Sequence, residues 1–461
     1  MGNAFGWTVC LAASVLALKA EAKAPQAAPP GPLADYVTRA DASYRWTKRR
    51  EGSLGEGRFV ELTLTSQTWR GIVWKHQLFI YKPKVVEGPK HAILWITGGA
   101  WHDSLARPVA DDAALPREVN ILAAAADRLK TPIAVVLNVP RQPILGGMVE
   151  DQAISYTFEQ YLRTRDATWP LLLPMVKSVV RAMDAVQECV KREWKLDIEH
   201  FTVTGASKRG WTTWLTAAVD SRVGAIAPMV IDVLNMGPQM KHQVETWGRY
   251  SEQLHDYTRR GIQQYMNSTP GQSLRAIVDP YSYRKTLSQP KLILLGTNDR
   301  YWPLDSLNLY WNDLVGDKYV LYVPNNGHGL HDLGRVIGTI SALHRHSMGQ
   351  LDLPKLGWDL KSTGSRLELD LTSDKRPTKV SAWIATSATK DFRQSRWKSV
   401  EVTEHDGHFH HAQSLSDDYT ALFGEAVFAD HGLPYYLSTT VKIAGGTRVS
   451  AHEKAVQPRV R

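Results

Sequence analysis

Five short apolar runs, separated by stretches of helical periodicity, constrain the fold of this chain more than any other feature of its sequence. The runs are HAILWITGG, TPIAVVLNVP, HFTVTG, VGAIAPMVID and KLILLGTND, and helical patterns such as EVNILAAAADRL and PMVKSVVRAMDAVQECVKR lie between them. Strands that are apolar along their whole length are buried on both faces, and parallel strands need helical crossovers. The alternation therefore predicts an α/β fold with a doubly wound, mainly parallel sheet covered by helices.

Changes in periodicity divide the chain into four segments. We expect a signal peptide in residues 1–22 and, in residues 23–43, a Pro/Ala-rich linker with too little apolar content to fold. The α/β domain is predicted over residues 44–351, with a helical cap insertion at about 236–288 where Tyr, Trp, Arg and Gln interrupt the strand rhythm. Residues 352–461 show strands only, which predicts a C-terminal all-β sandwich domain.

Composition and the N-terminal segment bear on localisation and partners. The formal charge of +9 is spread over 461 residues without a basic block, so we expect no nucleic-acid partner. The uncharged, largely apolar start with a small-x-small site ending at Ala22 predicts a cleaved secretory signal, and hence a secreted or periplasmic protein. This apolar run is too short for stable membrane insertion. Cleavage would leave Cys189 as the only cysteine, so no intramolecular disulfide is expected. The oligomeric state has no signal in the sequence.

Ser207 stands at the break of the segment FTVTGASKRGWTTWLTAAV, where a strand pattern ends and a helical pattern begins. Strand, sharp turn and helix form the context of a nucleophile elbow, in which small neighbours allow a strained turn to lift the serine hydroxyl above the sheet. Gly205 meets that need, but Arg209 stands where the common pattern has glycine, and Gly210 follows one place later. The alternative is that Ser207 only caps the helix.

A serine needs a base to become a nucleophile, and an acid to orient that base. Asp299 ends the strand KLILLG, and His328 follows the next strand, YVLYVP. The order Ser, Asp, His, with the last two at strand ends, is that of α/β-hydrolases. His331 is the alternative base, and Asp232, which ends the strand APMVI, is the alternative acid and a candidate substrate-binding residue.

The segment LWITGGAWHD, a strand followed by small residues, is the expected oxyanion loop. We expect one N–H donor from Lys208, next to the nucleophile, and a second from Gly99 or Ala100. Trp101, beside this loop, is a candidate for substrate binding. Arg209 is a second candidate, because a cation at a helix N-terminus is unfavourable toward the dipole and could instead hold a carboxylate or the oxyanion.

Several of these segments, together with GTNDRYWPLDSLNLYW, VPNNGHGLHDL and DQAISYTFEQYL, resemble the PhoPQ-activated pathogenicity-related protein family. The resemblance runs from about residue 36 to residue 331 and more loosely through the β-rich tail. It implies an exported protein of the α/β-hydrolase superfamily with a triad at Ser207, Asp299 and His328, and it supplies no substrate. Arg300 stands where the family pattern leads us to expect proline.

Other candidate ligand sites are weaker. His408 and His410 would share one face of a strand and could hold a metal, but no second ligand cluster accompanies them, so we expect a solvated strand and no metal. No Walker loop and no GxGxxG after a strand is present, so we expect no cofactor.

Cap aromatics are open to two interpretations. Trp247, Tyr250, Tyr257 and Tyr265 would line a substrate pocket or would fill the cap's own core.

These observations predict a secreted serine hydrolase that cleaves an ester or amide bond in a small-molecule or peptide substrate through an acyl-enzyme. A carbohydrate-directed esterase assisted by Arg209 is a special case of this prediction. The alternative from another class is a secreted binding or signalling protein on a catalytically silent hydrolase scaffold, with the cap and the β-sandwich as its recognition surface.

Overall fold

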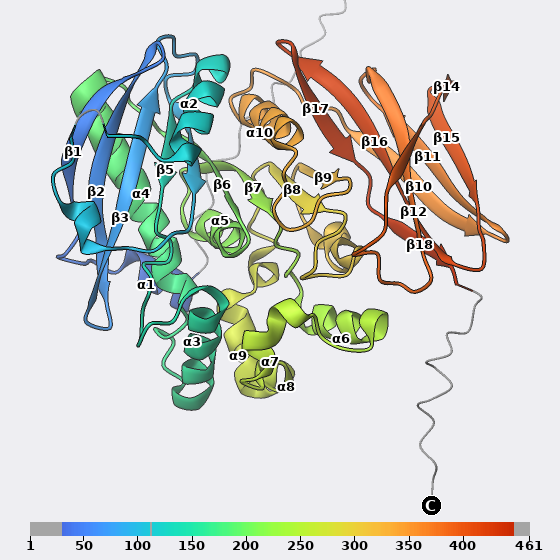
Figure 1. Ribbon diagram of the computed structural model, residues 1–461, viewed down its shortest axis with the longest axis horizontal. Helices are drawn as coiled ribbons and strands as arrows, with labels where there is room; N and C mark the ends of the chain where they lie inside the picture. The colour runs from blue at the N-terminus through green and yellow to red at the C-terminus, as the bar shows by residue number, and fades with distance from the viewer. Residues whose placement is uncertain (1–29, 111–112, 447–461) are drawn as a thin grey trace, which may run out of the picture.

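The computed structural model describes residues 30–110 and 113–446 (Figure 1). The predicted signal peptide lies outside these residues. No helix within the described ranges is long and apolar enough to cross a bilayer. The first part of the main sheet comprises β1 (Arg45–Leu54), β2 (Gly57–Trp69), β3 (Ile72–Lys82), β4 (His91–Ile96), β5 (Ile133–Val136), β6 (His200–Ala206), β7 (Val223–Met229), β8 (Lys291–Gly296) and β9 (Lys318–Val323).

The main sheet runs in the order β1-β2-β3-β5-β4-β6-β7-β8-β9. Neighbours from β5 to β9 are parallel, whereas β1, β2 and β3 are joined by antiparallel pairs and β3 pairs β5 in the same way. Successive side chains of a strand point to opposite faces, and both faces are buried here. In β8, Leu292 and Leu294 lie in one core cluster and Ile293 in another. The predicted mainly parallel, doubly covered sheet is confirmed.

Helices cover both faces of this sheet (Figure 1). The helices α1 (Pro32–Thr38), α4 (Leu172–Trp194) and α5 (Lys208–Val219) share a core cluster on one face. The other face is covered by α2 (Arg117–Leu129) and by α10 (Leu333–Ser347), which belong to two further clusters. Helix α5 contacts both β6 and β7, so the residue at its start lies above the carboxyl edge of the sheet.

The segment assigned to a linker contains an ordered helix, and that prediction is wrong for residues 32–38. Pro32 occupies the first turn of α1, where its fixed φ suits a helix start. Leu33 and Val37 are buried in the core, and Lys177 of α4 donates a hydrogen bond of 2.6 Å to the carbonyl oxygen of Arg39. Burial of these apolar side chains in the core and the hydrogen bond from α4 therefore hold this segment in place.

The predicted cap insertion is confirmed between β7 and β8. It consists of α6 (Met236–Trp247), η2 (Glu252–Leu254), α7 (His255–Thr258), α8 (Ile262–Tyr265), α9 (Thr269–Val278) and η3 (Pro280–Tyr283). Helix α3 (Glu150–Thr164) lies beside it and contacts α7, α8 and α9 (Figure 1). The insertion and α3 together close one side of the space beyond the carboxyl edge of the sheet.

The C-terminal part is an antiparallel β-sandwich, shown in orange and red in Figure 1. One sheet contains β10 (Leu356–Thr363), β11 (Arg366–Ser373), β14 (Glu404–His405) and β15 (His408–Ser414). The other contains β12 (Lys379–Ser387), β13 (Lys398–Glu401), β16 (Tyr419–Asp430), β17 (Leu433–Ser438) and β18 (Lys442–Gly445). Leu367, Leu369 and Leu371 alternate with polar residues along β11 and share a core with Leu422 of β16.

The predicted C-terminal β-sandwich is confirmed, and it is joined to the α/β part. Ser438 of β17 pairs with Val320 of β9, so one sheet continues from the strands of the α/β part into the sandwich. Helix α10 packs on β17, and a Cβ on Gly338 would lie only 2.2 Å from the carbonyl oxygen of Pro434. This pair gives one position at the edge of β9 a partner strand, and edge strands otherwise expose unpaired backbone groups.

Candidate active site

Ser207 lies in the turn between β6 and α5 with φ 59° and ψ −125°, a backbone conformation that costs a non-glycine residue free energy. Its N–H donates a hydrogen bond of 2.9 Å to the carbonyl oxygen of Met229 on the adjacent strand. Within the described chain its side chain accepts no capping hydrogen bond from α5. The geometry is that of a nucleophile elbow and differs from that of a serine cap.

Two glycines allow the close packing of this elbow. A Cβ on Gly205 would lie 2.8 Å from Cβ of Arg209, and a Cβ on Gly210 would lie 2.8 Å from the carbonyl oxygen of Met229. Both distances are shorter than side chains tolerate. The residue that meets the neighbouring strand is therefore Gly210, which explains why position 209 need not be glycine in this chain.

Arg209 turns away from the pocket and binds a carboxylate of this chain. Its guanidinium donates to both carboxylate oxygens of Glu150, at 2.8 and 2.5 Å, and to the carbonyl oxygen of Val139 at 2.6 Å. Burial acts to raise the pKa of Glu150, but Arg209 and Gln142 lower it below its ordinary value. The predicted anion-binding side chain thus has its partner already.

His328 and Asp299 form a hydrogen-bonded pair. Nδ1 of His328 lies 2.8 Å from Oδ2 of Asp299, and the other oxygen of Asp299 accepts the backbone N–H of Tyr301 at 2.9 Å. The ring of Tyr301 stacks on the imidazole with a centroid separation of 4.3 Å. The carboxylate therefore fixes the ring through Nδ1, and an aromatic face is available to stabilise an imidazolium.

His328 lines the same pocket as Ser207, and its second ring nitrogen, Nε2, is not the one bound by Asp299. Among the described residues, this buried Nε2 atom has no hydrogen-bond partner. It is free to accept a proton from a hydroxyl in the pocket. His331, the alternative base, is exposed, and its backbone N–H donates to the side-chain oxygen of Asn326.

The predicted oxyanion donors are the backbone N–H groups of Lys208, Gly99 and Ala100. Lys208 is the first residue of α5, so its N–H has no intrahelical acceptor. In the described part of the chain, no acceptor takes the N–H of Gly99 or of Ala100. Their loop lies against the first turn of α5, because a Cβ on Gly98 would be 2.2 Å from Nη2 of Arg209. The guanidinium of Arg209 thus packs directly against this loop.

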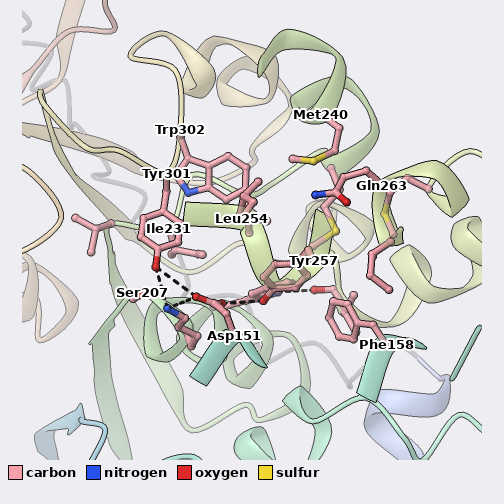
Figure 2. Close-up of a pocket in the computed structure, with 18 of the residues that line it drawn as sticks. Asp151, Phe158, Ser207, Ile231, Met240, Leu254, Tyr257, Gln263, Tyr301 and Trp302 are labelled. Carbon is pink, nitrogen blue, oxygen red and sulfur yellow. Dashed lines mark hydrogen bonds and ion pairs between the residues drawn. The ribbon is translucent and has the colours of Figure 1, made fainter. Parts of the chain in front are cut away.

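An apolar pocket opens beside Ser207 (Figure 2). The space between its side chains, including solvent at the mouth, is about 710 Å³. Its apolar lining comes from α3, α5, the end of β7, the cap and the loop after β8, and comprises Phe158, Trp211, Val230, Ile231, Val233, Met236, Met240, Leu254, Ile262, Met266, Leu274, Val278 and Trp302. In Figure 2, Phe158, Met240 and Gln263 lie on the side away from Ser207.

A polar network lies at the Ser207 end of the pocket (Figure 2). Asp151 accepts hydrogen bonds from Lys208 Nζ at 2.7 Å, from Tyr257 at 2.9 Å and from Tyr301 at 3.3 Å. Burial acts to lower the pKa of Lys208, but Asp151 and Tyr301 outweigh it and raise the pKa above its usual value. A charged ammonium is thus held next to the nucleophile.

Asp151 and Tyr301 are site residues that sequence reasoning missed. An acidic residue in the first turn of a helix is common because it complements the helix dipole, so Asp151 has no distinguishing signal. Tyr301 stands two residues after Asp299, close enough for the carboxylate to accept its N–H, and that short spacing was the one available signal.

Asp232 does not line the pocket beside Ser207. It borders a second, smaller cavity together with Asp299, Trp247 and Phe392. Oδ1 of Asp232 is buried and has no hydrogen-bond partner among the described residues. Burial, with a smaller contribution from the nearby Asp299, raises the pKa of Asp232 to about 7. The structure therefore pairs Asp299, and not Asp232, with His328.

The remaining aromatic candidates divide between pocket and core. Tyr257 lines the pocket, whereas Trp247 borders the second cavity. Tyr250 lies in a surface depression near Glu252, and Tyr265 is half exposed. Trp101 is buried and is not part of the pocket lining, so its predicted contact with substrate is not supported.

The histidine-rich segment forms β15. His408 lies 2.9 Å from Asp370 on the neighbouring strand β11, and His410 is exposed. Within residues 30–110 and 113–446, no group of three or more His, Cys, Asp or Glu side chains is placed to hold a metal ion.

Strand order, the elbow between β6 and α5, and the cap insertion after β7 define the α/β-hydrolase fold. A family model described as PhoPQ-activated pathogenicity-related protein matches residues 33–393. Autocrine proliferation repressor protein A of Dictyostelium discoideum is 33% identical over 385 residues, covering 78% of this chain and 76% of that protein. The chain belongs to the PhoPQ-activated pathogenicity-related protein family.

Two solved structures similar to this chain are esterases. An acetyl xylan esterase from Paenibacillus sp. R4 matches 66% of this chain and 91% of its own, with 13% identity and a TM-score of 0.45. A glucuronoyl esterase from Solibacter usitatus matches 68% of this chain and 91% of its own, with 12% identity and a TM-score of 0.41.

Proposed function

We propose that this protein is a secreted serine hydrolase that cleaves an ester or amide bond through Ser207, His328 and Asp299. One observation carries the proposal. Asp299 holds Nδ1 of His328 at 2.8 Å, Nε2 has no partner among the described residues, and His328 lines the same pocket as a serine in a strained elbow. A base oriented by an acid beside a serine is the arrangement that activates a hydroxyl.

The proposed reaction follows from these positions. His328 takes the proton of Ser207 as the hydroxyl attacks the substrate carbonyl, and Asp299 stabilises the imidazolium. The N–H of Lys208 and that of Gly99 or Ala100 stabilise the oxyanion, with each such donor worth about 3 to 4 kcal/mol in the transition state. His328 then protonates the leaving group, and water activated by the same histidine releases the acyl group.

The pocket indicates a substrate with an apolar group next to the scissile bond. Its walls are almost entirely aliphatic, aromatic and thioether side chains, with polar groups gathered at the Ser207 end. Such a lining favours burial of apolar surface, and the polar end orients the reacting carbonyl. Arg209 is already paired with Glu150, so we do not assign it to a sugar substrate.

Hydrolysis of p-nitrophenyl esters tests this function. We expect the wild type to cleave them and Ser207→Ala to lose turnover by about 10³-fold or more, since removal of the nucleophile leaves only binding and oxyanion stabilisation. The matched control is Ser282→Ala, a surface serine of the cap whose hydroxyl donates to the carbonyl of Arg275. Full activity in Ser207→Ala would refute the proposal.

A second candidate function rests on the related protein from Dictyostelium discoideum. That protein is named for autocrine repression of proliferation, which favours a signalling role for the same scaffold. A signalling protein without turnover would leave Ser207→Ala fully active in a binding or cell-growth assay. Export is part of both candidates, and the mass of the exported chain should correspond to cleavage near Ala22.

A further inference from the structure

The loop between β12 and β13 reaches from the C-terminal sandwich to the proposed triad. We call residues 391–397 of this loop the bracing segment. Phe392 and Trp397 anchor it, since each side chain is only 2% exposed and the ring of Trp397 lies 5.2 Å from that of Phe423 in β16. These three side chains belong to the core cluster of the α/β part, so the segment is fixed where the sandwich packs on that part, and its backbone carbonyls are held at defined positions.

Asn298 connects this segment to the acid loop. Its side-chain Nδ2 donates to the carbonyl oxygen of Ser395 at 2.7 Å and lies 3.3 Å from that of Phe392. Its Oδ1 accepts the hydroxyl of Thr297 at 2.8 Å. Both ends of the amide are thus occupied, and the next residue along the chain is Asp299. A shift of the bracing segment would move the carboxylate.

Asn325 makes the equivalent connection to the histidine loop. Nδ2 of Asn325 donates to the carbonyl oxygen of Trp397 at 3.1 Å, and the N–H of Trp397 donates back to Oδ1 at 2.8 Å. The backbone of Asn325 has φ 57°, a left-handed conformation that asparagine tolerates better than most residues. His328 follows three residues later. The reciprocal pair fixes the start of the loop that carries the base.

The acid and histidine loops also bind each other directly. The N–H of Asn298 donates to the carbonyl oxygen of Asn326 at 2.9 Å, and the N–H of Asn325 donates to the hydroxyl of Thr297 at 2.9 Å. A Cβ on Gly296 would lie 2.5 Å from the carbonyl oxygen of Asn326, so this close approach requires glycine. The two loops form one unit, which the bracing segment holds at two points.

The same segment contacts the cap. Arg393 donates to Glu252 at 2.8 Å and its guanidinium lies 4.2 Å from the ring centre of Trp247. Glu252 also accepts Arg300, the residue after Asp299, at 2.8 Å. Asp391 holds the guanidinium of Arg393 from the other side, at 2.8 and 2.6 Å. Cap, acid loop and sandwich therefore meet at this segment.

We propose that the bracing segment makes the C-terminal sandwich part of the catalytic apparatus, with Asn298 and Asn325 as the positioning residues that set the Asp299–His328 pair. The inference rests on the proposed hydrolase function. Neither asparagine lines the pocket, so each acts through the loop that follows it. Small displacements of reacting groups lower rates strongly, which is why positioning of this kind matters for turnover.

Variants of the two asparagines in the full chain provide the test. Asn298→Ala removes both donor and acceptor, and Asn325→Gly removes the amide while keeping a residue suited to positive φ. The control is Asn308→Ala: Nδ2 of Asn308 also donates to a carbonyl of the C-terminal part, Val441, at 2.9 Å, but it lies outside both triad loops. Asn325→Asp keeps the acceptor for Trp397 and should be intermediate.

Two readouts separate positioning from folding. The first is the second-order rate of Ser207 labelling by a fluorophosphonate probe, measured below the melting temperature of every variant. The second is the low-field proton resonance of the histidine Nδ1–H bound to Asp299, identified by its loss in His328→Ala. We expect Asn298→Ala and Asn325→Gly to label roughly 10- to 100-fold more slowly and to lose or shift this resonance. Asn308→Ala should stay within about twofold of the wild type in rate.

The outcomes distinguish the two proposals. If the wild type is labelled and both asparagine variants match it, the bracing role is wrong and the hydrolase function stands. If the wild type is not labelled, the hydrolase function fails, and the proton resonance decides the inference. A resonance that is present in the wild type and lost in both asparagine variants supports positioning. A resonance that is unchanged in the variants, or absent from the wild type as well, overturns it. Equal effects in Asn308→Ala would also overturn it, because they would show a general response to a weakened interface.

Discussion

Asp299 and Asp232 are buried carboxyl groups at the ends of successive strands, and their surroundings give them different properties. Asp299 accepts two hydrogen bonds, from the Tyr301 backbone and from His328. Asp232 has one oxygen without a partner in the described chain, and burial raises its pKa to about 7. Burial of a carboxyl group that lacks hydrogen-bond partners stabilises its neutral form, as at Asp232. The carboxylate that orients His328 is Asp299.

The free energy of unfolding should depend on pH because Asp232 is buried as a neutral acid. The groups that face Asp232 are Asp299 and Asp305, which act to raise its pKa, and Tyr310 and His242, which act to lower it. Its pKa is about 7 in the folded chain, against 3.8 for an aspartate exposed to water in the unfolded chain. The stabilisation from the protonated form is thus complete below about pH 4 and is lost as the pH rises to about 7.

The asparagine side chain in Asp232→Asn is neutral at every pH, so this variant does not lose stabilisation as the pH rises. Relative to the wild type, its free energy of unfolding should rise between about pH 4 and pH 7 by up to about 4 kcal/mol, and should stay level above that. Denaturant melts at several pH values measure the difference. A difference that does not vary with pH would contradict the assignment.

Residue identity allowed part of the site to be predicted. Ser207, Asp299 and His328 stand at ends of strands that the apolar pattern marks clearly. In the structure Ser207 and His328 line one pocket, and Asp299 is hydrogen-bonded to His328. The role of Arg209 could not be predicted, because its partner Glu150 is 59 positions away and a salt bridge at that separation has no local signal. Sequence reasoning assigned the guanidinium to a ligand, and the fold supplied an internal carboxylate.

At the scale of elements, the cap decides the form of the pocket. Helices α6, α8 and α9 contribute Met240, Ile262 and Leu274, and α5 closes the opposite wall with Trp211. Alternating apolar runs predicted the sheet and the insertion, because both depend on local periodicity. The course of each cap helix depends on packing against α3, which the sequence pattern does not express. The same holds for α1, whose short apolar face is buried in the core.

Bulk at the far end of the pocket should change the preference for acyl chain length. Met240 lies on α6 away from Ser207 (Figure 2), so Met240→Trp should fill space used by long chains and leave short ones unaffected. We expect kcat/KM for p-nitrophenyl octanoate to fall at least about tenfold relative to the acetate, since each excluded methylene is worth about 1 to 3 kcal/mol. Melting temperatures control for misfolding. An equal fall for both esters would contradict the pocket assignment.

At the scale of the whole molecule, the hydrolase part and the sandwich share a sheet. The shared sheet is joined by one residue pair between β9 and β17, and the packing of α10 on β17 and the hydrogen bonds of the bracing segment also connect the two parts. A pattern of strands only after residue 352 correctly predicted a β-sandwich, but no local pattern predicts which edge a distant strand will extend. Contacts between remote segments were therefore the part of the fold that sequence reasoning could not supply.

A chain that ends at residue 351 should not fold stably. Removal of the sandwich would take away the strand beside β9 and would remove Leu437 of β17 from the core cluster that it shares with Val336 and Ile340, which are each 2% exposed in the full chain. Each such side chain contributes about 1.5 to 3 kcal/mol when buried, and a typical domain has only about 5 to 15 kcal/mol in total. Soluble yield and thermal melts measure the effect. A cooperative melt within a few degrees of the full chain would show the α/β part to be independent.

The most direct test of the proposed triad is mass spectrometry of the purified protein after incubation with a fluorophosphonate probe, comparing the wild type with His328→Ala at several pH values between about 6 and 9. An activated serine predicts one adduct, on Ser207, that forms rapidly in the wild type and is lost or slowed by several orders of magnitude in the variant. No adduct at any pH, or equal labelling of both proteins, would contradict an activated serine and favour a binding protein on a silent scaffold.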